Sequence, residues 1–505
     1  MATEIEKGFS IRNQGNQSIL HKVASGLLVS VLVASVLPGC AAKRGQTLLG
    51  KESAVDLLPI PAKPGEIAAA TASEVNKTVA GLAPQGADTK SQISTADGGM
   101  IEVSINGLNL KEAVGLAIAR HPDISRAQAL VAQSESEVAV AKSAWFQTIQ
   151  YGVTPKYSRA VKNESYATVG VQQLVYDFGR SSSRVSAAQA TLEGDKFQLA
   201  DSIESIAYNT SVTFIELAAS QETIAAAGRQ VSSLQKTREK IESRVKAGLS
   251  DASDLNQAEV AIQRAEADVL AAQTDYDVAV GRLAEVAGVR PQRVESLDAT
   301  SSLLAGLDGA APAAIENTPA VLAAQAAARA AQERVKLARA NRYPSIGVSI
   351  AQDISVLKDI YGDYQKDTWV GLELSGDIST GGQSRHEVSA AEAEARAQSK
   401  SLENERLAAR TALGSAQTQA AGAAARLQSY ESVIGLSRSL LDLYWQEYTL
   451  DKRPLTDVIS AERDIYQSEV SRITAIADGN IARVKANAAV GRLVAQLKAG
   501  KNSSK

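Results

Sequence analysis

The feature that most constrains the fold of this chain is an internal duplication. The sequence pattern that begins near residue 108 is repeated, with fewer identical residues, from near residue 315. At an offset of 197 residues, Pro122 matches Pro319 and Val138 matches Val335. Farther along the offset is 203, and there Gly179 matches Gly382, Val185–Ala188 matches Val388–Ala391, and Asp254 matches Asp457. Chance matches of Ala are common in this composition, but an ordered series of Pro, Gly and Asp matches is not. We therefore predict two copies of one unit, in residues 106–305 and 306–497.

Each copy leaves room for very long helices. No Pro occurs between Pro155 and Pro291, and Pro is the residue that most strongly interrupts a helix. A helix over residues 181–247 would be about 100 Å long. In residues 255–286 the apolar positions then step by three and four, which is typical of a coiled-coil seam. Hydrophobic residues reach 45% while aromatic residues are only 4%, and many of the seam residues are Ala, which allows close helix packing.

Short alternating segments follow the first helices of each copy. We predict strands at residues 149–158, 166–175, 346–354 and 368–378. A length of about ten residues, with one apolar and one polar face, suits a transmembrane β-strand; the alternative is a pair of ordinary hairpins on a soluble domain. Four strands cannot close a membrane barrel, which needs about eight, and open sheet edges are not tolerated in lipid. Strands from several chains would therefore have to combine.

The N-terminus has the pattern of a secretory signal. Three basic residues precede the uncharged, mostly apolar run 23–37, which is too short for a membrane-spanning helix. The following Leu37-Pro38-Gly39-Cys40 resembles a bacterial lipobox, in which the Cys is lipidated. We thus predict a lipoprotein signal peptide at 1–39, lipid on Cys40, a flexible tether at 40–105 and a tail at 498–505; the alternative is ordinary signal cleavage nearby.

The composition excludes several classes of function. Lys+Arg 53 against Asp+Glu 56 gives a formal charge of -3, so the chain has no general attraction to nucleic acid. One Cys and three scattered His residues cannot build a Cys-rich zinc site, an iron–sulfur cluster or a disulfide framework. No Gly-rich stretch leads into the Lys and Ser or Thr of a phosphate-binding loop. We predict a protein that is not an enzyme and carries no cofactor or metal.

Several motifs in order make the chain resemble the TolC family of outer-membrane efflux and secretion channels. They are Leu110–Pro122, Leu174–Arg180 (LVYDFGR), Gly248–Leu255, Tyr343-Pro344, Gly381-Gly382 and Leu455–Ala461. The resemblance implies a mainly α fold with a small transmembrane β part. Four strands per chain would join in a homotrimeric 12-stranded β-barrel in the outer membrane. An α-helical tunnel would continue the barrel into the periplasm.

The resemblance also implies where the tunnel closes. The periplasmic gate would consist of Tyr448 and Arg453 as hydrogen-bond donors, Ser253 and Asp254 as acceptors, and Asp457 in a ring of carboxylates around the bore. The alternative is that these are solvated turn residues, with the aspartates capping helices. Asp451 stands where the first copy has Gly248, so we expect Pro454 to supply the second turn.

The resemblance thus implies an outer-membrane channel-tunnel that exports its cargo with a periplasmic adaptor and an inner-membrane ABC or RND transporter. Two features point to different cargo: the Asp177–Arg180 motif favours protein export by type I secretion, whereas a lipobox is more usual in the drug-efflux branch of the family. The alternatives are a periplasmic adaptor, which usually carries more strands, and a structural coiled-coil lipoprotein that tethers membranes. Such a tether would not need duplicated strands of membrane length.

Overall fold

The computed structural model describes residues 105–156, 164–306, 311–355, 366–377 and 381–499. All of them belong to one compact unit, Ala62–Lys505. The predicted signal peptide, Cys40, nearly all of the predicted tether and the chain after residue 499 lie outside the described residues.

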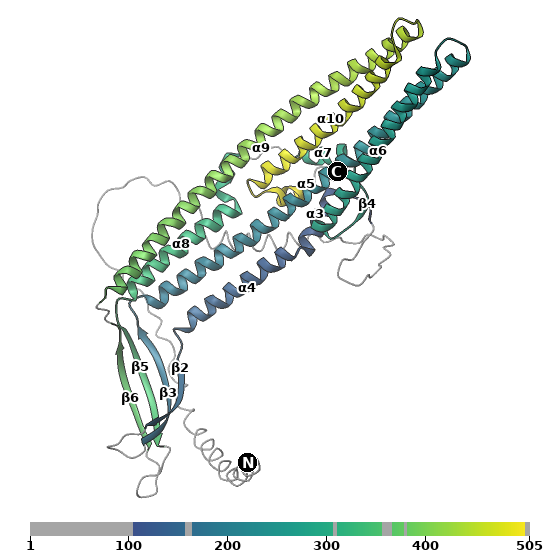
Figure 1. The fold of residues 1–505 in the computed structure, drawn as a ribbon. Helices are drawn as coiled ribbons and strands as arrows, with labels where there is room; N and C mark the ends of the chain where they lie inside the picture. Colours follow the sequence, from purple (N-terminus) through teal and green to yellow (C-terminus); the bar gives the residue numbers. More distant parts are fainter. Residues whose placement is uncertain (1–104, 157–163, 307–310, 356–365, 378–380, 500–505) are drawn as a thin grey trace, which may run out of the picture. The chain divides into compact units, whose positions relative to one another are not determined.

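Both copies contain a helix, two strands and two long helices in the same order (Figure 1). The first copy contains β1 (Ile105–Leu108), α3 (Leu110–Arg120), α4 (Pro122–Ser143), β2 (Thr148–Lys156), β3 (Glu164–Tyr176), α5 (Arg180–Lys246), α6 (Ala252–Ala287), β4 (Pro291–Val294) and α7 (Leu297–Ala305). The second contains the 3-10 helix η2 (Pro312–Asn317), α8 (Pro319–Ala340), β5 (Ser345–Ser355), β6 (Lys366–Ser375), α9 (Gln383–Thr449), α10 (Leu455–Ala488) and α11 (Leu493–Ala499). The predicted fold class within one chain, long helices with a small β part in a duplicated unit, is confirmed.

The two long helices, α5 and α9, have 67 residues each, about 100 Å at 1.5 Å per residue. Each begins after a glycine with a left-handed backbone, Gly179 with φ 89 and Gly382 with φ 75, a conformation that a side chain would strain. Among the described helices, none combines the length and the apolar character that crossing a membrane would require.

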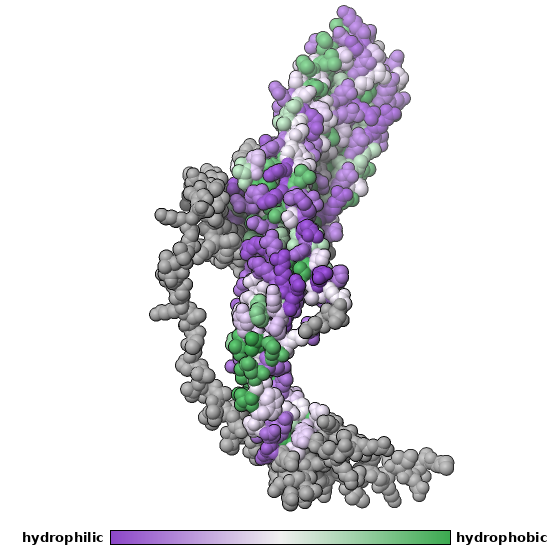
Figure 2. All heavy atoms as spheres, turned by 90° about the vertical axis from the view of Figure 1, so that its left-hand side faces the viewer, coloured by the Kyte–Doolittle hydropathy of each residue, from purple (hydrophilic) through white to green (hydrophobic). Residues whose placement is uncertain are grey.

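The four longer strands form one antiparallel sheet in the order β2-β3-β5-β6. β6 ends at Ser375, earlier than predicted, because its partner β5 begins at Ser345, opposite Ser375. The residue before Ser345 is Pro344, which has no N–H to extend the ladder. The register places the apolar residues on one face, as in the row Ile149, Val171, Ile350 and Val370. Figure 2 shows hydrophobic residues gathered over the sheet near its junction with the helices.

The helices continue the sheet in two tiers. Next to the sheet, α4 packs on α5, α5 on α8, and α8 on α9. Farther along, α6 packs on α5, α5 on α10, and α10 on α9. The largest core lies where these tiers meet α3 and α11, around the fully buried Phe214, Leu217, Leu283 and Leu493. Beside it β1 pairs in parallel with β4, so the start and the end of the first copy are held together.

Candidate functional site

The candidate site lies at the two inter-helix turns, at the ends of α5 and α9 that point away from the sheet. The α5–α6 turn contains Gly248 with φ 74, and the α9–α10 turn contains Asp451 with φ 54. The second turn is therefore made by Asp451 in the left-handed region, and the expectation that Pro454 supplies it is wrong. Pro454 instead precedes the first residue of α10 as its N-cap. Asp tolerates this backbone better than most side chains do because of its short polar group.

Tyr448 joins the two hairpins. Its ring is buried against Ile241, Ala258, Leu455 and Val458. Its hydroxyl donates to Oδ2 of Asp254 on α6 at 2.7 Å and lies 3.1 Å from the Ser250 hydroxyl. Because the phenol proton goes to the carboxylate, Ser250 is the donor of the second bond.

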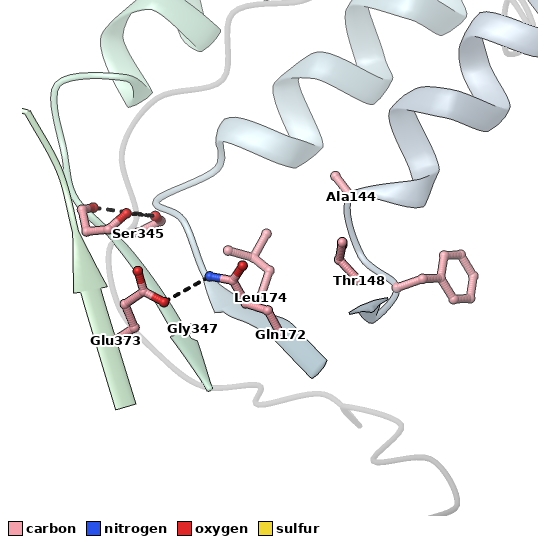
Figure 3. A pocket seen from close by; sticks show the side chains of 9 residues that line it. Ala144, Thr148, Gln172, Leu174, Ser345, Gly347 and Glu373 are labelled. Carbon is pink, nitrogen blue, oxygen red and sulfur yellow. Dashed lines mark hydrogen bonds between the residues drawn. The ribbon is translucent and has the colours of Figure 1, made fainter. Parts of the chain in front are cut away.

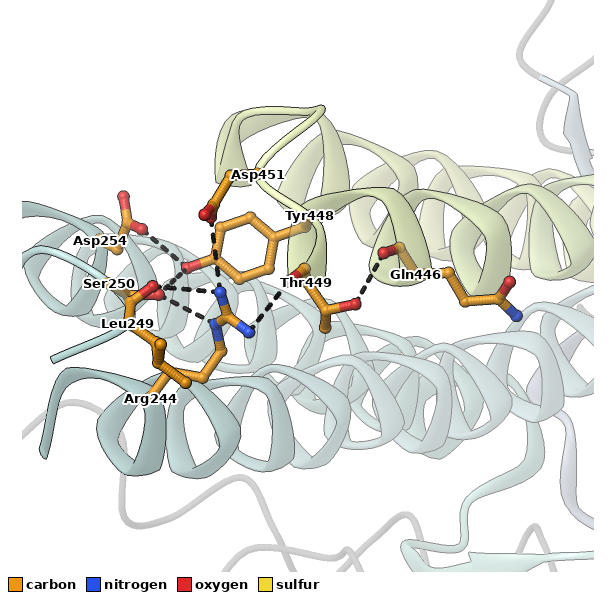
Figure 4. A network of polar contacts seen from close by, with 8 residues as sticks. All are labelled: Arg244, Leu249, Ser250, Asp254, Gln446, Tyr448, Thr449 and Asp451. Carbon is orange, nitrogen blue, oxygen red and sulfur yellow. Dashed lines mark hydrogen bonds and ion pairs between the residues drawn. The ribbon is translucent and has the colours of Figure 1, made fainter. Parts of the chain in front are cut away.

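Arg244, in the last turn of α5, organises this network and was not predicted from the sequence. Its Nε donates to Ser250 Oγ at 3.0 Å, Nη2 donates to the Leu249 carbonyl at 3.1 Å, and Nη1 reaches the Thr449 carbonyl of the other hairpin at 3.3 Å. Nη2 also lies 3.5 Å from Asp451 Oδ1, and the guanidinium covers the Tyr448 ring at 5.3 Å. Figure 4 shows Arg244 between the two turns, with Ser250, Asp254 and Asp451 around it.

The network has a defined direction of hydrogen bonding. Arg244 donates to Ser250, Ser250 to Tyr448, and Tyr448 to Asp254. Burial, with a further contribution from the Asp254 carboxylate, raises the pKa of the Tyr448 phenol. The phenol therefore keeps its proton at neutral pH and remains a donor to Asp254, so a charge-assisted hydrogen bond ties the two hairpins.

The other predicted gate residues lie differently. The Arg453 guanidinium donates to Glu447 Oε2 and to Asp457 Oδ2, both at 2.7 Å, and lies 3.9 Å from the Tyr444 ring centre. Within one chain it therefore binds its own hairpin and not Ser253 or Asp254. The structure brings Tyr448 to Asp254 as predicted by position, but Ser250 takes the place given to Ser253.

A second polar link between the hairpins lies farther from the turns. Glu469 of α10 binds Arg229 of α5 and Arg438 of α9, each at 2.8 Å, and only 10% of its side chain is exposed. Seven residues closer to the turn, Glu462 accepts from Ser233 of α5 at 2.8 Å, and burial raises the pKa of its carboxyl. The sequence offered no signal for these links, because charges on long helices usually form a solvated face.

The site has the geometry of a structural link and not of a reaction centre. In the part of the chain that the structure describes, no group of three or more His, Cys, Asp or Glu residues could hold a metal ion. The groups at the turns are a phenol, hydroxyls, carboxylates and guanidinium groups that saturate one another. Such an arrangement can hold two helical hairpins together or release them.

Comparison with known proteins identifies the family. The sequence profile of the outer membrane efflux protein family matches residues 113–289 and 310–492, one segment in each copy. The chain belongs to this family, so it is an outer membrane efflux channel protein and not an enzyme.

Relatives agree with this assignment. The chain is 23% identical to outer membrane efflux protein BepC of Brucella suis biovar 1 over 396 residues, covering 76% of this chain and 86% of that protein. It is 24% identical to protein CyaE of Bordetella pertussis over 335 residues, covering 62% and 69%. The fold matches that of the outer membrane protein VceC from Vibrio cholerae with a TM-score of 0.64 at 17% identity, covering 76% of this chain and 96% of that one.

Proposed function

We propose that copies of this chain assemble side by side into a closed ring, in which the sheets form one barrel through the outer membrane and the helices form a periplasmic tunnel. The observation that carries the proposal is an open edge on the same two sides of every tier. The first copy supplies one edge (β2, α4 and α6), and the second copy supplies the other (β6 and α9). One chain placed beside the next would thus continue all tiers together. Interfaces of this head-to-tail kind close into rings.

The sheet needs such neighbours most. One edge of β2 and one edge of β6 have no strand partner in the described sheet, and unpaired backbone groups in lipid cost several kcal/mol each. The apolar face is widely exposed in the single chain, with Tyr151 at 87%, Leu372 at 74% and Val370 at 71%. In the ring, lipid would cover this apolar face, and strands of neighbouring copies would pair with the backbone groups at both edges. Three chains with four strands each give the homotrimer and the barrel that the family resemblance implies.

The helical edges offer matching seams. On α9 one stripe of exposed, uncharged residues runs through Leu407, Thr411, Gly414, Thr418, Ala421, Ala425, Ser429, Ser432, Leu436, Leu440 and Leu443. Its spacing of three and four residues is that of a helix-packing seam. At the opposite edge, α6 exposes Val260, Leu270 and Val278. In the ring, the α9 stripe of one copy would be covered by α6 of the next.

The mass of the assembly in detergent tests the ring. Protein extracted from purified outer membranes should have three times the mass of the mature chain. The full sequence, with the predicted signal peptide, weighs 52.9 kDa. Leu440→Glu should shift this mass toward the monomer, because it places a charge in the seam. Ser439→Glu, one residue off the stripe, serves as the control. A wild-type monomer that is released without detergent would refute the proposal.

The turn network would be the gate. In this proposal Tyr448, Asp254, Ser250 and Arg244 hold the two hairpins of one chain together, which keeps the tunnel entrance narrow. Arg453, Ser253 and Asp457 are proposed to complete the closed entrance in the ring, where neighbouring copies meet. Arg453→Ala should raise the conductance of the reconstituted channel by loosening the entrance, and an unchanged conductance would count against this role.

The remaining assignments rest on the sequence and the family. We propose a periplasmic adaptor and an inner-membrane ABC or RND transporter as partners, and a lipid anchor on Cys40. The two copies, 106–305 and 306–497, would each contribute half of the wall. The cargo would be small molecules or proteins exported by type I secretion; the relative BepC is named an efflux protein. Co-purification of the trimer with a membrane transporter, compared with a Leu440→Glu variant, would test the partnership.

A further inference from the structure

The inference concerns the polar face of the sheet, and it rests on the proposed function, in which this face lines the bore of the barrel. The register places Gly152, Thr168, Asp353 and Asp367 in one row across the four strands. Glu373 lies on the same face, six residues from Asp367 along β6, or about 20 Å at 3.4 Å per residue. The face therefore carries carboxylates at two levels.

On the described strands, basic residues of this face do not balance these carboxylates. In the described strands, the only basic residue at a register position of this face is Lys156, and it lies directly opposite Glu164. Lys366 belongs to the other face, since it pairs with Ile354. Asp353, Asp367 and Glu373 form no ion pair with a described basic residue. Within the described strands, each chain thus presents three carboxylates without a basic partner on this face, and a ring would repeat both levels in every copy.

The carboxylates are placed in ways that sheet stability does not explain. Asp353 and Asp367 lie directly opposite each other on β5 and β6, and like charges in that position destabilise a sheet. Thr168 Oγ1 donates to Asp353 Oδ1 at 2.5 Å from the other side. Glu373 is held by Gln172 Nε2 at 3.0 Å, and Gln172 in turn accepts from Gln150 at 3.1 Å. An uncharged residue at position 353 or 367 would remove the repulsion between the two opposed carboxylates.

Glu373 also borders a hollow on this face, at the junction with the helices. The hollow has a volume of about 200 Å³ and is lined by Gln172, Leu174, Ser345 and Gly347 among others. Figure 3 shows the Glu373 carboxylate directed toward Gln172 across this space. The Glu373 carboxylate thus lies at the edge of this hollow, where it accepts a hydrogen bond from Gln172.

The gate residues differ in this respect. Asp457, which the resemblance places in the carboxylate ring of the entrance, is bound to Arg453 at 2.7 Å, so its charge is offset within the chain. We propose that the barrel, through Asp353, Asp367 and Glu373, makes the channel selective for cations and sets a preference for cationic or neutral cargo over anionic cargo. Rings of acidic side chains select cations in this way, and lumen residues tune the selectivity of membrane barrels.

Reversal potentials across a planar bilayer with a KCl gradient test the proposal. The measurements are made at about 0.1 M salt, where charges act over about 10 Å, and in a Tyr448→Phe background, which removes the hydroxyl that bonds Asp254 and Ser250. The wild-type barrel should pass K⁺ in preference to Cl⁻. The triple variant Asp353→Asn, Asp367→Asn and Glu373→Gln should bring the permeability ratio toward one, with single-channel conductance retained.

The control is Asp457→Asn in the same background, which should change the ratio much less. If the triple variant does not assemble, Glu373→Gln alone is measured, since a Gln there can still bond Gln172. A wild-type ratio of one or an anion preference would overturn the inference, as would a ratio that follows Asp457 and not the barrel residues. An absence of conductance together with a monomeric mass in detergent would instead refute the proposed channel assembly.

Discussion

Replacing Arg244 by Ala should loosen the link between the two hairpins. The side chain is 17% exposed; it donates to Ser250 and Leu249 of its own turn and, at 3.3 Å, to the Thr449 carbonyl of the other hairpin. Hydrogen bonds from a charged donor are each worth about 1.5–3 kcal/mol, but the exposed ion pair with Asp451 contributes only about 0–1 kcal/mol. The bonds are not additive, and water replaces part of them. We therefore expect a loss of about 1–2 kcal/mol per chain, or about 5-fold to 30-fold in the closing equilibrium.

Single-channel recording in planar bilayers measures this effect directly. The Arg244→Ala channel should show a higher open probability or a higher conductance than the wild type at the same voltage and salt. Lys246→Ala is the matched control, because Lys246 lies two residues away with 74% of its side chain exposed and bonds only Glu242 on its own helix. Equal conductance for wild type and Arg244→Ala, in trimers of normal mass, would refute the assignment of Arg244 to the gate.

Two further predictions concern buried carboxylates away from the turns. Glu469→Gln removes the charge shared by Arg229 and Arg438 and should lower the unfolding temperature of the detergent-extracted protein. The expected loss of stability is about 1–2 kcal/mol, because the two arginines are half-exposed. Glu403→Gln, in the exposed pair Lys400–Glu403, is the control, and equal unfolding temperatures for both variants would contradict a stabilising role of Glu469. Burial raises the pKa of Glu204 to about 7 despite hydrogen bonds from the Leu493 and Val494 N–H groups, with Asp201 adding to the rise. The folded chain then binds this proton more tightly than the unfolded chain, so the contribution of Glu204 to stability is present below about pH 4.5 and is lost as pH rises to about 7. Stability of Glu204→Gln should fall less over that range than stability of the wild type, and parallel pH profiles would show the reasoning to be wrong.

Local features of this protein could be predicted from its sequence because they depend on neighbours a few residues apart. The helix predicted at 181–247 is observed at Arg180–Lys246, since only the absence of Pro and a continuous helical period are needed. The four strands also lie close to their predicted places, since alternation of apolar and polar residues defines them. Tyr448 and Asp254 were assigned by position in a resemblance, and the structure places them 2.7 Å apart.

The rest depends on contacts between residues far apart in the chain. A stripe on α9 or α6 predicts that a helix packs somewhere, but the stripe does not say which helix packs there. Arg244 was missed because its acceptors, Ser250 and the Thr449 carbonyl, come together only when two hairpins lie side by side. The same holds for Glu469, whose partners are 240 and 31 residues away.

By itself, the sequence determined the duplication, the lengths of the helices and strands, and the family. Only the tertiary structure decided the lateral order of the elements, the donor network at the turns and the charge of the polar sheet face. The physical reason is that secondary structure follows from short-range periodicity, whereas side-chain partners depend on how whole helices and strands align. Asp353 and Asp367 illustrate this dependence, because the register of β5 and β6 alone places the two carboxylates opposite each other.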